Sequence, residues 1–272
     1  MNKHNLKWWA AYGTAIGAVR HHNIIPWDDD VDICMPREDF DKLSNLKGEF
    51  DKTPYKLMVM GDDDLFTSES KIVLRESSWQ EKSFHFCNTG VYIDIFPLDS
   101  IDNTIDDIVK IQNRFLKLNR KYYLSLVRTS LSLLLDSLLH AEFKDVLVQI
   151  LGIIYPYKKK AKYLQDFNAL IDTLKKGGDC GYLVSFCGIY GKKDIFNREL
   201  FAHTIEMPFD DFYVKMPARY DEWLRNIYGN YMQLPPEEKR ISHHNQYYVN
   251  LSRRLSHSGI VERVKQNITH EM

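Results

Sequence analysis

The sequence has few cysteines, no long apolar run and almost no net charge, and each lack excludes a class of protein. The four cysteines form no C-x-x-C pair and match no zinc-ligand spacing, so we expect reduced thiols in the cytoplasm. No stretch approaches the ~18 uninterrupted apolar residues of a membrane-spanning helix. The residues after Met1 include no apolar segment of the kind that signal peptides carry, so we expect no signal peptide. Apolar residues make up 44% and charged residues 27%, which excludes a disordered or fibrous chain.

The net charge of −1 conceals two halves of opposite charge. Residues 1–107 hold 11 basic and 20 acidic residues, a net −9, whereas residues 108–272 hold 25 and 17, a net +8. The small total argues against a dedicated nucleic-acid-binding protein, and we expect no nucleic-acid partner. The split predicts cations near the first half and anionic groups near the second, although a drift of surface charge along the chain would give the same numbers.

The order of sequence patterns predicts an α+β fold, with a mixed sheet in the N-terminal part and a mostly helical C-terminal part. Alternating or continuous apolar patterns predict strands near 6–12, 27–35, 55–60, 71–75 and 91–96. Helical patterns cover 15–21, 37–46, much of 105–175 and 220–228. Thr104 and Asp107 form a capping signal before the long helical part. We therefore divide the chain into a β-rich core, residues 1–102, and a mostly helical region, residues 103–272.

The strongest chemical signal is four aspartates in five positions, Asp28, Asp29, Asp30 and Asp32. On a strand, alternate side chains share a face, so Asp30 and Asp32 would point the same way while their apolar neighbours point into the core. Two fixed carboxylates repel each other unless a cation lies between them, and Mg²⁺ or Mn²⁺ prefers such oxygen ligands. An exposed acidic turn is the alternative, but the apolar flanks and the alternate spacing argue against it.

Two further features fit a metal ion that holds a nucleoside diphosphate. Gly13-Thr14 stands at a strand-to-helix turn, where backbone N–H groups and a helix N-terminus favour a phosphate. Asp94 is a single acid on an otherwise apolar strand, where a buried carboxylate without a partner is costly. It is either a third metal ligand or a structural residue that its neighbours satisfy.

These motifs closely resemble those of the LicD family, whose members have the nucleotidyltransferase fold. The resemblance rests on residues 13–20, GTAIGAVR, and 25–40, IPWDDDVDICMPREDF, and on 93–99, IDIFPLD, 228–232, YGNYM, and 234–240, LPPEEKR. It spans about residues 8–245. The sequence differs from the family pattern in two places: few residues precede Trp8, where members usually carry a helix, and Ala15-Ile16 stand where a Leu-Leu pair is usual.

The resemblance implies a transferase that moves a phosphorylated alcohol from a CDP-activated donor to a cell-surface glycan and releases CMP. Bacterial members are known chiefly as phosphocholine transferases that modify teichoic acid, lipopolysaccharide or capsule, and the related fukutin group transfers ribitol phosphate. CDP-choline is thus the expected donor, and a glycan or lipid-linked glycan is the expected acceptor. Transfer of ribitol or glycerol phosphate, a true nucleotidyltransferase that releases pyrophosphate, and a non-catalytic glycan-binding scaffold are the alternatives.

The resemblance also implies roles for individual residues. Asp30, Asp32 and Asp94 would carry Mg²⁺ (or Mn²⁺) and the catalytic chemistry. A second group would contact the donor phosphates: Gly13, Thr14 and Arg20. Residues 1–102 would then be the catalytic core, and residues 103–272 would complete the active site and the acceptor surface.

Several other residues have both a functional and a structural interpretation. Possible substrate contacts are Arg37, Lys71, Arg240 and His243, each of which can instead be a surface or turn residue. The general base is open between Asp28, Asp94 and a histidine. Aromatic residues of the N-terminal half can form a cation–π box for choline or simply the core.

Residues 131–155 and the lysines that follow them have two interpretations as well. They suit an interfacial helix with a basic flank, which would place the protein peripherally at the inner face of the cell membrane. Ordinary core helices followed by a solvated lysine run are the alternative.

Overall fold

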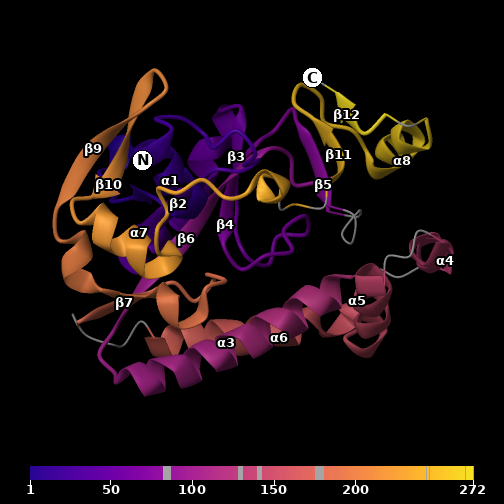
Figure 1. Cartoon of the computed structure of the whole chain (residues 1–272). Coiled ribbons are helices and arrows are strands. Elements are labelled where there is room, and N and C mark those ends of the chain that lie inside the picture. The colour runs from indigo at the N-terminus through magenta and orange to yellow at the C-terminus, as the bar shows by residue number, and fades with distance from the viewer. Residues whose placement is uncertain are drawn as a thin grey trace.

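A computed structural model describes residues 1–81, 87–127, 131–139, 143–174, 181–242, 244, 246–266 and 268–271. The fold is the α+β architecture that the sequence predicts, with a curled mixed sheet and several helices (Figure 1). The strands are β1 (Trp9–Ala10), β2 (Asp32–Pro36), β3 (Tyr55–Met58), β4 (Ser70–Leu74), β5 (Ser78–Glu81), β6 (Tyr92–Ile101), β7 (Tyr182–Val184), β8 (Ile195–Asn197), β9 (Thr204–Phe209), β10 (Phe212–Pro217), β11 (Gln246–Asn250) and β12 (His270–Glu271). The helices are α1 (Tyr12–Arg20), α2 (Arg37–Asn45), α3 (Ile105–Leu126), α4 (Leu131–Leu139), α5 (Phe143–Ile154), α6 (Lys160–Leu174), α7 (Tyr220–Tyr228) and α8 (His257–Lys265).

The main sheet places three charged positions side by side at its centre. Its strand order is β1-β2-β6-β4-β3, with β7 and β8 added beside β6. β2 and β6 are parallel with Asp32 opposite Asp94, and β4 is antiparallel to β6 with Lys71 opposite Asp94. Because directly paired residues point to the same face of a sheet, this register groups the two carboxylates and the ammonium.

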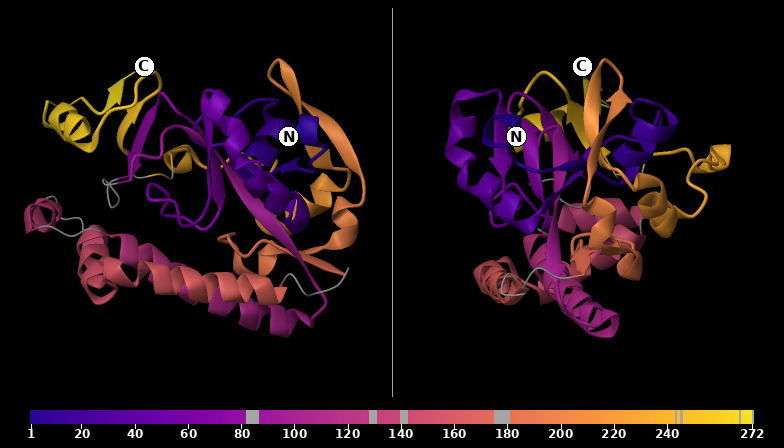
Figure 2. Two further views of the ribbon diagram at one scale, coloured as in Figure 1. Left: turned by 180° about the vertical axis from the view of Figure 1, so that it is seen from behind. Right: turned by 90° about the vertical axis from the view of Figure 1, so that its left-hand side faces the viewer.

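The helices α3 and α6 lie side by side beneath the sheet, and α5 continues this layer (Figures 1 and 2). The Thr104 hydroxyl accepts a hydrogen bond from the Asp107 N–H, which confirms the predicted cap of α3. Phe115 of α3 packs against Phe167 of α6 and Phe186, with ring centroids 4.6 and 5.4 Å apart. No helix in the described ranges is long and apolar enough to cross a membrane.

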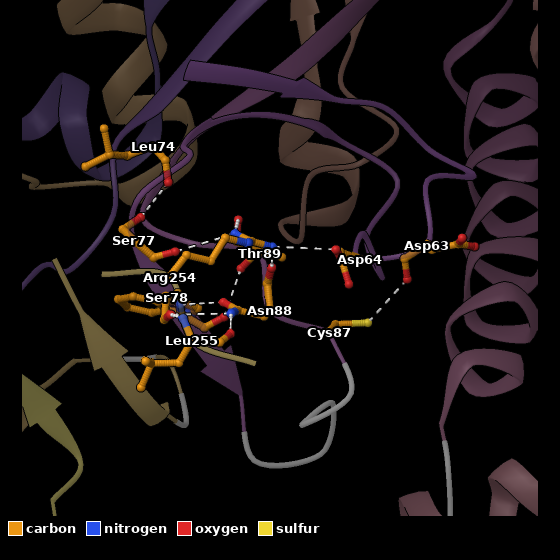
Figure 3. Close-up of polar contacts among 11 residues, drawn as sticks. Asp63, Asp64, Leu74, Ser77, Ser78, Cys87, Asn88, Thr89, Arg254 and Leu255 are labelled. Carbon is orange, nitrogen blue, oxygen red and sulfur yellow. Dashed lines mark hydrogen bonds and ion pairs between the residues drawn. The ribbon is translucent and has the colours of Figure 1, made fainter. Parts of the chain in front are cut away.

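The C-terminal segment returns to the N-terminal half, where β11 pairs antiparallel with β5. Arg254 donates hydrogen bonds to the backbone carbonyls of Ser77, Asn88 and Thr89 (Figure 3). The buried Asn88 side chain accepts from the N–H of Trp79 at 3.1 Å and donates to the carbonyl of Leu255 at 2.9 Å. These bonds attach the segment after β11 to the loop that precedes β6.

The strand boundaries around the acidic cluster differ from the sequence prediction. The predicted strand over 27–35 is wrong in its first half, because β2 begins only at Asp32. Consecutive aspartates disfavour an extended strand, and the chain turns there instead, with the Asp28 N–H bonded to the Ile25 carbonyl at 2.8 Å. The predicted strand over 6–12 is limited to Trp9–Ala10, and α1 already begins at Tyr12, whose φ is +43°.

Candidate active site

Three carboxylates meet at one face of the sheet. Asp32 and Asp94 come from the paired positions of β2 and β6, and Asp30 lies two residues before Asp32 in the loop that enters β2. One oxygen of each lies within 4.8 Å of the others. Asp32 and Asp94 are buried, whereas Asp30 is half-buried. The three residues that the sequence singled out therefore lie together, even though Asp30 is not on the strand.

The electrostatics of this cluster favour a bound cation. Burial, followed by the charges of Asp30 and Asp94, holds the pKa of Asp32 well above its usual range. Burial also raises the pKa of Asp94 to about 7, and burial with neighbouring carboxylates raises the pKa of Asp28 to about 7. A divalent cation would offset this repulsion. Because the donors are all carboxylate oxygens, the residues fit Mg²⁺ or Mn²⁺.

The first turn of α1 is fixed directly to the cluster. The Asp32 N–H donates a hydrogen bond of 2.8 Å to Oγ1 of Thr14, which is buried. A Cβ atom at Gly13 would lie 2.2 Å from Oδ2 of Asp28. Only a residue without a side chain thus lets this carboxylate approach the helix N-terminus, whose partial positive charge favours it.

Lys71 lies in the site rather than at a solvated strand edge. Its side chain is 2% exposed, and its ammonium forms an ion pair with Asp94. The same Nζ lies 3.6 Å from the centre of the Tyr92 ring and 4.0 Å from Oε1 of Glu69. Burial lowers the pKa of Lys71, but the charges of Asp94 and Glu69 outweigh it and raise the pKa overall. The lysine therefore stays protonated against a buried carboxylate.

Comparison with known proteins identifies the family of this fold and site. Residues 5–132 match the model of the LicD/FKTN/FKRP nucleotidyltransferase domain, and this range contains Gly13, Thr14 and all three carboxylates. This match assigns residues 5–132 to that domain family. Over 253 residues it is 25% identical to the lipopolysaccharide cholinephosphotransferase LicD of Haemophilus influenzae, covering 85% of this chain and 84% of that protein. An uncharacterized protein of Rickettsia prowazekii is 44% identical over 55 residues, which is 20% of this chain and 21% of that protein.

Two of the predicted cations, Arg20 and Arg240, lie near each other beside a C-terminal loop. Nη1 of Arg20 donates a hydrogen bond of 2.6 Å to the carbonyl of Tyr231, and burial and the charge of Arg240 lower the pKa of Arg20. Arg240 donates to the carbonyl of Pro235 at 2.9 Å, and its guanidinium lies 5.5 Å from the centre of the Trp27 ring. His243 lies outside the described residues.

Arg37 is not with the carboxylate cluster. Its Nε and Nη2 atoms donate to the two oxygens of Asp99 at 2.7 and 2.9 Å. The same residue lines a cavity of about 160 Å³ together with Ser70 and Cys187, and none of the described lining residues belongs to the carboxylate cluster. The bidentate ion pair fixes Arg37 to Asp99, and its role as a substrate contact stays a prediction.

No sequence pattern indicates that Asp29, in the loop before β2, contacts the C-terminal part of the chain. Its carboxylate is hydrogen-bonded to His244 Nδ1 at 2.8 Å and accepts from Gln246 Nε2 at 2.6 Å. His244 Nε2 also lies 3.6 Å from Asp30. Burial lowers the pKa of His244, but its bond to Asp29 and the nearby negative charges outweigh it and raise the pKa to about 9. Because 215 residues separate the pair, no local pattern could have predicted it.

Proposed function

We propose that this protein transfers a phosphorylated alcohol, with phosphocholine the first choice, from a CDP-activated donor to a hydroxyl group of a cell-surface glycan, releasing CMP. The observation that carries the proposal is the cluster of Asp30, Asp32 and Asp94 in a chain related over most of its length to a lipopolysaccharide cholinephosphotransferase. CDP-choline and lipopolysaccharide or a similar glycan are accordingly the proposed partners.

In this proposal, Asp30, Asp32 and Asp94 hold Mg²⁺ or Mn²⁺. The ion would orient the donor phosphates and offset the charge that develops during transfer at phosphorus. Lys71 favours the ionised form of Asp94 against the effect of burial and holds the carboxylate in place, because its ammonium is the fixed partner of that carboxylate. The backbone of Gly13 and Thr14 at the N-terminus of α1 would receive the donor phosphates.

The two parts of the chain would divide the work. We propose that residues 1–102 supply the metal and donor site, and that residues 103–272 complete the active site and the acceptor surface. The contacts of Arg20 with the loop at Tyr231 and of Asp29 with His244 support this division, since both join the parts beside the cluster. A cytoplasmic setting suits Cys34, Cys87 and Cys187, which form no disulfide in the described part of the chain.

A CMP-release assay tests this function. Asp32→Asn and Asp94→Asn should each lower the rate by roughly a thousandfold, the equivalent of about 4 kcal/mol of transition-state stabilisation. Asp211→Asn changes an exposed carboxylate outside the site and serves as the matched control. Near-normal turnover of either site variant would refute the metal assignment.

The donor is identified by a binding panel. CDP-choline, CDP-ribitol and CDP-glycerol, each with Mg²⁺, should raise the thermal midpoint to different extents, because a ligand that binds only the folded state stabilises it according to its occupancy. We expect the largest shift with CDP-choline. A larger shift with either of the other donors would replace choline in the proposal, and no shift with any of them would refute a CDP-alcohol donor.

A further inference from the structure

The helix α5 presents an apolar stripe to the outside of the molecule. Phe143, Leu147, Ile150 and Ile154 follow at i, i+4, i+7 and i+11, and each is 45–74% exposed. This spacing places them on one face of the helix. Gln149 and Gly152 are buried and face inward, and the partly buried Val148 packs against the hydrophobic cluster that contains Tyr122. The helix therefore turns an apolar face to solvent, where a helix on a water-facing surface would be polar.

The neighbouring helix α4 also turns apolar side chains to solvent. Leu131, Leu135 and Leu138 are exposed at i, i+4 and i+7, whereas Ser137 is buried. Gln149 of α5 donates a hydrogen bond of 3.1 Å to the Ser137 hydroxyl. The two helices thus pair through a buried polar contact and direct their leucines and isoleucines outward. Figures 1 and 2 show α4 beyond the end of the α3 and α6 pair.

Exposed apolar side chains are concentrated in this one segment. Of the 21 large hydrophobic residues that are exposed in the described ranges, 10 lie between Leu131 and Tyr157. We call these 10 residues the apolar surface: Leu131, Leu135, Leu138, Leu139, Phe143, Leu147, Ile150, Ile153, Ile154 and Tyr157. Contiguous apolar patches of this kind mark a surface that another apolar phase or partner covers.

The charge around the apolar surface indicates what covers it. Residues 110–162 hold 11 basic and 3 acidic residues in the sequence, a net +8, which equals the whole basic excess of residues 108–272. Lys144, Lys158 and Lys159 are exposed at its edges. In a two-fold dimer through this face, the same basic residues would meet their own copies and repel. A bilayer with anionic headgroups complements both the apolar surface and its basic border.

We propose that α4 and α5 lie in the headgroup layer of an anionic membrane, with the apolar surface facing the acyl chains. The helices have 9 and 12 residues, too few to span a bilayer, so both would lie along its plane. This docking surface goes beyond the proposed transfer reaction and does not depend on it. It would hold the protein at the membrane, where a lipid-linked acceptor is found.

Vesicle co-sedimentation tests the docking surface. The wild-type chain should sediment with phosphatidylcholine vesicles that contain phosphatidylglycerol and much less with pure phosphatidylcholine. Raising the ionic strength from about 0.1 M to about 1 M shortens the Debye length from about 10 Å to about 3 Å and should weaken the binding. Leu147→Glu with Ile150→Glu should lower the partition coefficient at least about tenfold, because two apolar anchors are lost and two negative charges face the anionic surface.

A matched variant separates docking from a general effect of charge. Phe212→Glu with Leu251→Glu changes two similarly exposed apolar residues outside the apolar surface by the same charge and should sediment like the wild type. Thermal unfolding of both double variants checks that they fold. Equal sedimentation of the two variants, or no binding of the wild type to anionic vesicles, would overturn the proposal.

Two further readouts distinguish other outcomes. A wild-type dimer in light scattering that Leu147→Glu with Ile150→Glu converts to a monomer, without vesicle binding, would mean that a second copy covers the face, and would also overturn the proposal. Vesicle binding is measured without donor or acceptor. Absence of transfer activity in the wild-type chain would therefore refute the proposed function and leave the docking result unaffected.

Discussion

At the scale of single residues, the ion pair between Lys71 and Asp94 is the most consequential contact of the site. Both side chains are buried, and the ammonium also lies against the ring of Tyr92. Removing one partner of a buried pair leaves an uncompensated charge, whereas removing both does not. The lysine thus stabilises the fold in the same place where it holds a proposed metal ligand.

This arrangement predicts the effect of Lys71→Met on stability. The substitution should lower the free energy of unfolding by about 3–5 kcal/mol, because Asp94 is left buried without its cation. The double variant Lys71→Met with Asp94→Asn should recover much of that loss. Urea unfolding of Lys71→Met, of Asp94→Asn and of the double variant measures the three free energies. A double variant as unstable as the sum of its single variants would show that the two residues do not act as a pair.

A second residue-scale prediction concerns pH and Asp194, which is fully buried and accepts a hydrogen bond of 3.1 Å from the Tyr12 hydroxyl. Burial raises its pKa from 3.8 to about 6. The folded state therefore binds a proton more tightly than the unfolded state. The stability that this proton contributes is fully present below pH 3.8 and is lost as the pH rises through about 6.

Asp194→Asn isolates that contribution. Because Asn does not ionise, the variant should gain stability relative to the wild type by about 3 kcal/mol as the pH rises through the window between the two pKa values. Urea unfolding across that window measures the difference, with Asp211→Asn as an exposed control. A difference that stays constant with pH would contradict the burial of an ionisable Asp194.

At the scale of elements, the C-terminal segment is held to the core by a few specific bonds. Arg254 reaches the carbonyls of three residues in the loops around β5, and Leu255 bonds to Asn88 and Ser78 (Figure 3). Arg254→Ala should raise hydrogen exchange in β11 and α8 at least tenfold, since a charge-assisted bond to the backbone contributes about 1.5–3 kcal/mol. The adjacent exposed Arg253, changed to Ala, is the control, and equal exchange in both variants would show that Arg254 does not anchor the segment.

The elements also show which features a sequence reveals. α2, α7 and the start of α3 agree with the prediction nearly to the residue, because signals such as the cap at Thr104 and the break at Gly229 are local. β5, β7, β8 and β11 were not predicted. They are short strands, and their partners lie far away in the sequence, as in the pairing of β11 with β5.

The same distinction holds for the site. Asp30, Asp32 and Asp94 were predicted because a carboxylate among apolar residues is conspicuous within a few positions of sequence. The contacts of Asp29 with His244 and of Lys71 with Asp94 depend on which strands and loops become neighbours, and no short motif encodes that. The pairing of Arg37 with Asp99 is likewise a long-range contact that the neighbouring motif does not encode.

At the scale of the whole molecule, the structure joins an acidic site to a basic, apolar helical layer. The cluster at Asp30, Asp32 and Asp94 lies on the sheet, and the apolar surface lies on α4 and α5 at the end of the helices beneath it (Figure 1). The basic excess of the second half of the sequence lies in residues 110–162, around the apolar surface, and part of the acidic excess of the first half is the aspartate cluster. A cation and a nucleotide are proposed for the first, and anionic lipid for the second.

The proposed reaction moves the phosphorylated alcohol itself, and isotopic labelling of the donor distinguishes this from transfer of the nucleotide. With ³²P in the β-phosphate of CDP-choline, we predict that the label moves to the glycan together with choline. With ³²P in the α-phosphate, we predict that the label stays in CMP. Appearance of the α-phosphate label in the acceptor would contradict the account, because it would mean that the enzyme transfers the nucleotide.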